Sequence, residues 1–344
     1  MAAFSVFVFH VFMGAIKDNF LPDYLSGTFL IDFYWSLQFG VELFFIISGY
    51  LIASSVCRHR SATRFLVDRA IRVYSAFIPC IALIFAIGPF VHFQYFDNLG
   101  YFDIFYLFIV NVMFLPGVFP IPAALFVAWS LSYEATYYLY AAFMWSLSRY
   151  CGRSFVIISL IPCAVFCCFY PRSQFFVIGA LLFLYPDFPK AFSRVGKWLA
   201  LPALAGLYWA CWRWELDQNA AVDSLSRNGL ILFSLLCAAT LFAPVCRDAR
   251  SSLSGILRSR ALQFLGTISY SLYLWHPLIM FVTKRVSEHI LSKFGGWAVF
   301  LSFAFSSLAG ALVVAWASWY LFEVLAVAFL KGRARRWTMA AAQA

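Results

Sequence analysis

The sequence predicts an all-α integral membrane protein, and two features of its composition carry this prediction. Of the 344 residues, 64% are hydrophobic and only 12% are charged, whereas soluble domains are about one quarter charged. The hydrophobic residues also gather into long runs, and a run of about 20 apolar residues is enough to cross a bilayer as a helix. We therefore expect one membrane domain with about ten transmembrane helices.

One stretch, Gly40 to Tyr74, orients the whole chain. Its first half, residues 40–56, is apolar and aromatic, and its only acid is Glu42. A dense basic segment follows, in which the only acid is Asp68 and the basic residues are Arg58, Arg60, Arg64, Arg69 and Arg72. An apolar run that stops at a basic loop is typical of a transmembrane helix that ends at the cytoplasmic face.

The remaining runs are assigned in order along the chain. The first, residues 2–16, is shorter than a full span and has no basic flank before it, so we expect this helix to begin upstream of Met1. Residues 101–115 are also short and are interpreted as an interfacial or re-entrant helix. The other predicted spans are roughly residues 35–56, 73–93, 123–147, 154–170, 173–185, 198–212, 230–245, 264–282 and a part of 297–330.

The charge distribution supports this order of spans. With the N-terminus placed inside, 18 of the 25 Lys and Arg residues fall in cytoplasmic segments, as the positive-inside rule requires. The net charge of +10 is thereby explained by topology, and no nucleic-acid partner is expected. Both termini are predicted to be cytoplasmic, with residues 1–331 forming the membrane domain and residues 332–344 a short basic tail. The nine cysteines show no metal-binding spacing, and no metal site is expected.

Five ionisable side chains lie inside predicted spans: His10, Glu42, Glu134, His276 and Glu323. Each costs a few kcal/mol at the bilayer centre, so each is a candidate functional residue. Structural interpretations compete with the functional interpretation of these residues. Glu42 could cap or pair with a neighbouring helix, and Glu323 is equally well placed to pair with the basic tail. For His276 we favour a structural role, with its ring bonded to a nearby hydroxyl of its own segment.

No structural role is evident for His10 on so apolar a helix. Apolar surroundings keep an imidazole neutral, and a neutral ring nitrogen can accept the proton of an alcohol. Glu134 lies at a similar depth on a span of opposite direction and could orient that ring. Arg69 and Arg72, at positions i and i+3, share a helix face and suit a phosphorylated ligand. On spacing alone, however, the two arginines are better interpreted as a topology signal.

Five motifs resemble the membrane-bound acyltransferase-3 family: VFVFH, FGVELFFIISGYLI, FLVDRAIRVY, WSLSYEATYYLY and FLGTISYSLYLWHPL, in this order. The resemblance implies a ten-helix bundle that moves an acyl group from a cytoplasmic donor to an acceptor hydroxyl. It implies His10 as the catalytic histidine, Arg69 and Arg72 as the donor-binding pair and Glu134 as part of the motif in the fourth span. We therefore predict His10 and Glu134 as the catalytic residues. Structural or accessory roles are left for Glu42, Ser269, Tyr270, His276 and Glu323.

We therefore predict an O-acyltransferase of the inner (cytoplasmic) membrane. Acyl-CoA, with acetyl-CoA as the expected form, is a co-substrate, and no bound cofactor is expected. The predicted acceptor is a cell-envelope or exported polysaccharide or a glycolipid. Two alternatives remain open: a transporter or flippase, and a catalytically inactive relative. The family carries an arginine eleven positions before its histidine, and here that position falls upstream of Met1.

Overall fold

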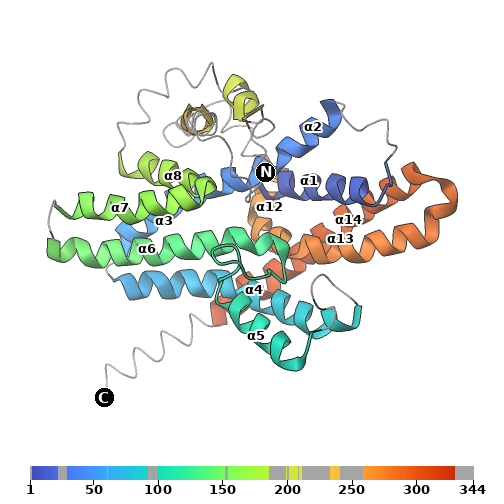
Figure 1. The fold of residues 1–344 in the computed structure, drawn as a ribbon, viewed down its shortest axis with the longest axis horizontal. Helices are drawn as coiled ribbons and strands as arrows, with labels where there is room; N and C mark the ends of the chain where they lie inside the picture. The colour runs from blue at the N-terminus through green and yellow to red at the C-terminus, as the bar shows by residue number, and fades with distance from the viewer. Residues whose placement is uncertain are drawn as a thin grey trace.

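The structure is a computed structural model, and it describes residues 2–21, 29–59, 61–91, 96, 99–151, 154–185, 199, 201–207, 209–210, 233–240 and 259–329. Within these ranges the regular structure is helical and no β-sheet is formed, so the predicted all-α class is confirmed. The long helices run along one axis of an elongated bundle (Figure 1). The predicted spans at 198–212 and 230–245 are described only in part, and the tail, residues 332–344, lies outside the described residues.

Three helical stretches among the described residues are long and apolar enough to cross a membrane: Phe33–Arg58, Ala62–Val91 and Gly296–Phe329. The number rises to four if α12 (Arg260–Thr267) and α13 (Ser269–Leu291), which meet at a 71° bend, are one broken span. The chain is therefore a membrane protein. The number of ten spans and the side on which each terminus lies stay predictions.

The first of these stretches joins α2 (Phe29–Ser36), the short η2 (Leu37–Phe39) and α3 (Gly40–Arg58). The second is α4 (Ala62–Val91), and the third runs from α14 (Gly296–Ser318) into the π-helix η6 (Trp319–Ala326). α4 begins well before the predicted position 73, so Arg69 and Arg72 lie in the helix itself. The helix therefore extends about three turns before the predicted span, and these turns carry Arg64, Asp68, Arg69 and Arg72.

The shorter helices complete the described fold. They are α1 (Ala2–Lys17), α5 (Tyr101–Val112), η3 (Phe126–Ala128), α6 (Trp129–Cys151), α7 (Ser154–Phe169), η4 (Pro171–Ser173), α8 (Gln174–Leu184) and η5 (Ser292–Phe294). α5 has 12 residues, too few to cross a bilayer, and its first residues Tyr101 and Phe102 are almost fully exposed. The helix is thus short, as expected, and its interfacial or re-entrant position stays a prediction.

Two glycines allow close packing between α3 and α8. A Cβ atom added to Gly49 on α3 would lie 2.1 Å from the carbonyl oxygen of Phe176 on α8. The reverse contact is as close, since a Cβ at Gly179 on α8 would lie 2.0 Å from the carbonyl oxygen of Ile46. Small residues are what let two backbones approach within a membrane, where dispersion contacts drive association.

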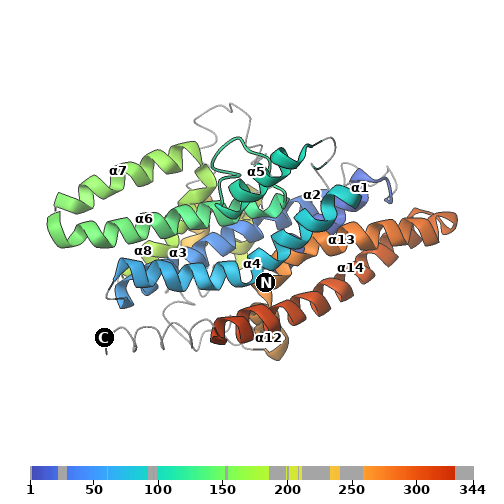
Figure 2. The same cartoon turned by 90° about the horizontal axis from the view of Figure 1, so that it is seen from below.

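The buried apolar side chains form two clusters. The larger is built mainly from α3, α4, α6 and α8, with Phe45, Phe77 and Phe176 among its fully buried members. The smaller joins α1 to α13 and α14 through Phe7, Phe303 and their neighbours. In Figure 2 the α13 and α14 pair runs beside α4 and forms one flank of the bundle. α1 contacts both α13 and α3, so it lies at the junction of the two clusters.

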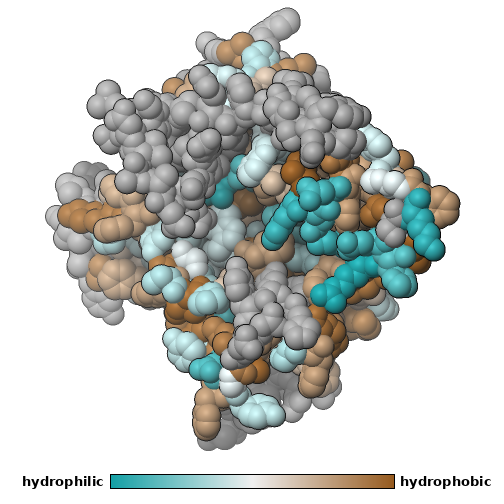
Figure 3. Space-filling model, turned by 45° about the vertical axis from the view of Figure 1, so that its right-hand side comes forward, coloured by the Kyte–Doolittle hydropathy of each residue, from teal (hydrophilic) through white to brown (hydrophobic). Residues whose placement is uncertain are grey.

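One end of the bundle is polar. α1 and α13 both end there, and Lys284 of α13 forms an ion pair of 2.5 Å with Asp18, which follows α1. Figure 3 turns this end forward and shows hydrophilic side chains gathered on it, with hydrophobic side chains on the flanks. A polar end with apolar flanks is the surface expected of a bundle that spans a bilayer. In the predicted topology this is the outer end.

Candidate active site

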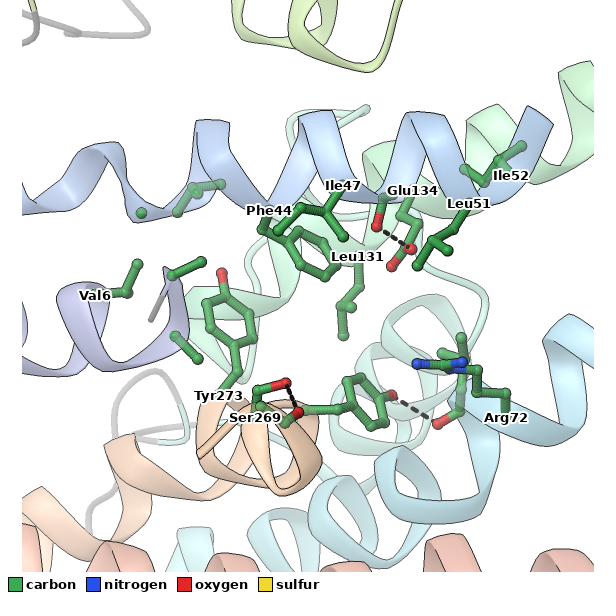
Figure 4. A pocket seen from close by; sticks show the side chains of 18 of the residues that line it. Val6, Phe44, Ile47, Leu51, Ile52, Arg72, Leu131, Glu134, Ser269 and Tyr273 are labelled. Atoms are coloured by element: carbon green, nitrogen blue, oxygen red, sulfur yellow. Dashed lines mark hydrogen bonds between the residues drawn. The ribbon is translucent and has the colours of Figure 1, made fainter. Parts of the chain in front are cut away.

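A cavity of about 350 Å³ lies where α1, α3, α4, α6 and the α12–α13 bend meet. Its walls are mostly apolar, with Phe44, Ile47 and Leu51 contributed by α3 and Leu131 by α6. Figure 4 shows Arg72 on one side of this space and Val6 of α1 on the other, with Glu134 and Tyr273 between them. A mostly apolar cavity with a few convergent polar groups is the usual form of a small-molecule site.

Arg69 and Arg72 both line the cavity, as their shared helix face predicts. The guanidinium of Arg69 lies over two aromatic rings, 5.7 Å from the centre of Phe65 and 5.8 Å from that of Tyr138. The Arg72 side chain is exposed. One arginine is thus held in place by aromatic rings while the other is open to solvent, an arrangement that presents positive charge at this side of the cavity.

Glu134 is buried on α6 and faces the same cavity. Its Oε1 atom accepts two hydrogen bonds of 2.7 Å, from the hydroxyl of Ser48 on α3 and from that of Tyr138 one turn along α6. Both Arg69 and Arg72 interact with it electrostatically. The structure therefore groups Glu134 with the arginine pair, and the interaction with His10 that we suggested from its depth is not formed.

His10 is instead surrounded by rings. Its imidazole meets Phe126 edge-on, with ring centres 4.8 Å apart, and it stacks on the imidazole of His276, with centres 5.3 Å apart and planes 24° apart. Phe9 lies beside it on the same helix, with centres 4.9 Å apart. The helix contact between α1 and α13 brings these two histidines together.

His276 is fully buried. Its Nδ1 atom lies 3.1 Å from the carbonyl oxygen of Leu272, so the expected hydroxyl partner is replaced by a backbone carbonyl of its own helix. Its Nε2 atom has no hydrogen-bond partner among the residues that the structure describes.

The histidine pair lies one helical turn beyond the cavity on both of its helices. His10 follows the cavity residue Val6 by four positions on α1, and His276 follows the cavity residue Tyr273 by three on α13. The ring of Tyr273 is 6.0 Å from that of His276, centre to centre. Its hydroxyl donates to the carbonyl of Val127, at 2.9 Å, which fixes the ring at this end of the cavity.

The accessory candidates have mainly structural partners. Ser269 donates to the carbonyl of Gly266 at 2.8 Å within the α12–α13 bend, whereas Tyr270 donates to the carbonyl of Val73 at 2.7 Å and so ties the bend to α4; both residues line the cavity. Glu323, inside the π-helix η6, accepts a hydrogen bond of 2.7 Å from Ser271 and interacts electrostatically with Arg72. Its suggested partners in the basic tail lie outside the described residues.

Arg172 is an ion-pair partner of Glu42 that was not among the residues predicted from the sequence. It lies between the predicted spans 154–170 and 173–185, but its Nε lies 2.5 Å from Oε1 of the buried Glu42 and its guanidinium lies 5.0 Å from the ring centre of Trp129. The Nη2 atom is also 3.4 Å from the side-chain oxygen of Gln38. The available signal was that a lone acid inside a span and a lone arginine between two short spans both require a partner.

The fold and the cavity together define a class: a helical membrane protein with a cavity lined by two arginines and a buried carboxylate, and with a stacked imidazole pair one helical turn beyond it. A family model described as an acyltransferase domain, that of the acyltransferase-3 family, matches residues 1–316. The chain belongs to this family and is an acyltransferase. It is also similar to nodulation protein 10 of Rhizobium leguminosarum bv. viciae, with 26% identity over 292 residues that cover 76% of each chain. No solved structure matches the chain significantly.

Proposed function

We propose that the protein transfers an acyl group, with acetyl as the expected group, from a cytoplasmic acyl-CoA to a hydroxyl of a cell-envelope or exported polysaccharide or of a glycolipid. The observation that carries this proposal is that one cavity is lined by Arg69 and Arg72 on one side and by Val6 on the other, and Val6 lies one helical turn before His10 on α1. This supports a donor that enters by its charged end and a reaction that takes place at the histidine.

Arg69 and Arg72 bind the phosphates of the donor. Guanidinium groups bind phosphate oxygens through paired, charge-assisted hydrogen bonds. The apolar walls from Phe44, Ile47 and Leu51 then suit the flexible arm that links the phosphates to the thioester. Glu134, held by Ser48 and Tyr138, balances the arginine charge inside the bundle and keeps the two guanidiniums oriented.

His10 acts as the general base. The acceptor hydroxyl gives its proton to a neutral ring nitrogen of His10 while its oxygen attacks the thioester carbonyl carbon. The carbon–sulfur bond then breaks, and the departing thiolate takes the proton back from the imidazolium. The products are the ester and the free thiol, and the ring returns to its neutral form. The apolar ring environment of His10 supports this role because it disfavours a permanently charged imidazole.

The membrane arrangement is part of the same proposal. We place the protein in the inner membrane as a multi-pass protein with ten spans and both termini in the cytoplasm, which sets the Arg72 side of the cavity towards the cytoplasmic donor. Reporter fusions after Arg72 and after Arg260 should read cytoplasmic, and fusions at Asp97 and Asp217 should read external. A cytoplasmic reading at Asp217 would contradict the ten-span arrangement.

Vesicles that contain the purified protein and envelope material test the activity. Acetyl-CoA labelled in its acetyl group should transfer the label covalently to the envelope fraction, with one free thiol released for each acetyl group transferred. Label that crosses the membrane without a covalent product would support the transporter or flippase alternative. If the label is neither transferred nor transported, the result would support the alternative of a catalytically inactive relative.

A further inference from the structure

The unpartnered nitrogen of His276 carries an inference beyond the assignment of His10. We infer that His276 is a specificity-determining residue whose Nε2 atom accepts a hydrogen bond from a second hydroxyl of the acceptor, next to the one that is acylated. The inference rests on the proposed acyl transfer at His10. It names the acceptor class as one with two adjacent hydroxyl groups.

The hydrogen-bond partner of Nδ1 sets the tautomer of His276. The carbonyl oxygen of Leu272 can only accept, so the Nδ1 atom that lies 3.1 Å from it carries the ring proton. In a neutral imidazole the other nitrogen, Nε2, is then a hydrogen-bond acceptor. Its missing partner must therefore be a donor, and a hydroxyl is a donor of the kind that the reaction brings to this site.

Burial makes the missing partner significant. The His276 side chain is fully buried, and its Nε2 atom is one of two buried side-chain atoms without a partner in the described part of the chain. Leaving such an atom unpaired carries a desolvation cost, so a ligand that pairs with it binds more tightly by that amount. A phenylalanine at this position would pack equally well and would bury no nitrogen without a hydrogen-bond partner.

The position of His276 matches a second hydroxyl. Its ring stacks on His10 with centres 5.3 Å apart, so a group held at one imidazole is adjacent to a group held at the other. The two oxygens of a vicinal diol are attached to neighbouring carbons, which allows one to react at His10 while the other binds at His276. Phe7 lies edge-on to His276, with ring centres 6.1 Å apart, and closes another side of the ring with an apolar surface.

The experiment compares acceptors with and without adjacent hydroxyls. Envelope material is oxidised with periodate, which cleaves vicinal diols and leaves isolated hydroxyls, and is then reduced with borohydride. With labelled acetyl-CoA, the wild-type protein should label the treated material at least about tenfold less than the untreated material, a ratio that corresponds to ~1.4 kcal/mol. Equal labelling of the two materials would overturn the inference.

Variants separate recognition from packing. His276→Phe keeps an aromatic ring and should raise the KM for untreated acceptor by about tenfold, with the KM for acetyl-CoA unchanged. His276→Gln, whose amide oxygen can accept the same hydrogen bond, should recover part of the loss. Trp275→Phe serves as the structural control, because it removes a buried hydrogen bond to Ser318, 2.8 Å long, without touching the pair.

Each outcome decides one of the two claims. If His276→Phe behaves like Trp275→Phe, with lower thermal stability and no selective change in acceptor KM, His276 is structural and the inference fails. If the wild-type protein labels no acceptor at all, the proposed function fails. Wild-type labelling that His276→Phe leaves unchanged would overturn the inference alone.

Discussion

The imidazole rings of His10 and His276 stack with their centres 5.3 Å apart, although the two residues lie near opposite ends of the chain. The contact joins α1 to α13, and both rings lie one turn beyond the cavity that Arg69 and Arg72 line. Within the proposed mechanism this relationship places the base and the acceptor-binding residue side by side. It also gives α1 a partner that no local feature of its sequence predicts.

His10→Ala should reduce acyl transfer by about 10²–10⁴-fold, because a positioned general base typically contributes that much. The variant should still insert, since it removes a polar group from an apolar helix. The measurement is label transfer from acetyl-CoA at matched protein levels. His289→Ala, at an exposed histidine near the end of α13, is the matched control and should keep its activity. Near-normal transfer by His10→Ala would refute the role assigned to His10.

Arg69→Gln combined with Arg72→Gln should raise the KM for acyl-CoA by at least about tenfold, because two charge-assisted contacts to phosphate are removed. The acceptor KM should change little. Arg64→Gln is the control, since Arg64 lies on the same helix, is exposed and does not line the cavity. If the KM for acyl-CoA is the same in the double variant and in Arg64→Gln, the arginine pair is a topology signal only.

Arg172→Leu should destabilise the protein by about 3–5 kcal/mol, because it leaves the buried carboxylate of Glu42 without its cation. Glu42→Gln in the same chain should recover much of that loss, since the remaining side chain is neutral. Thermal unfolding of the detergent-solubilised protein measures both. A double variant whose loss equals or exceeds the sum of the two single losses would show that the ion pair is not the source of the effect.

Gly49→Ala and Gly179→Ala should each lower thermal stability, because an added Cβ would lie 2.1 Å or 2.0 Å from a carbonyl oxygen of the opposite helix. The helices would have to separate, which removes packing that drives association in a membrane. Gly266→Ala is the control, as a Cβ there meets nothing within 4 Å. Unchanged unfolding temperatures for both interface variants would mean that α3 and α8 pack less closely than described.

By itself, the sequence determined the class of the protein and most of its helices. The reason is the bilayer, which admits only long apolar segments whose backbone hydrogen bonds are satisfied internally, so hydropathy and helix position are closely linked. The same rule marked Glu42, Glu134, His10 and His276 as candidates, because each is an ionisable residue in an apolar run. Hydropathy marks the apolar part of α4 from residue 73, whereas the helix itself begins at Ala62, because a helix can continue beyond its apolar segment.

The tertiary structure decided which of these residues meet. The sequence allowed Glu134 to orient His10, yet packing places Glu134 with Ser48 and Tyr138 and gives His10 the ring of His276 instead. Arg172 looked like a loop residue until α7, η4 and α8 brought it against Glu42. The sequence shows at which depth and on which face of its own helix a side chain lies. Which residues it contacts depends on the packing of helices that are distant in the chain.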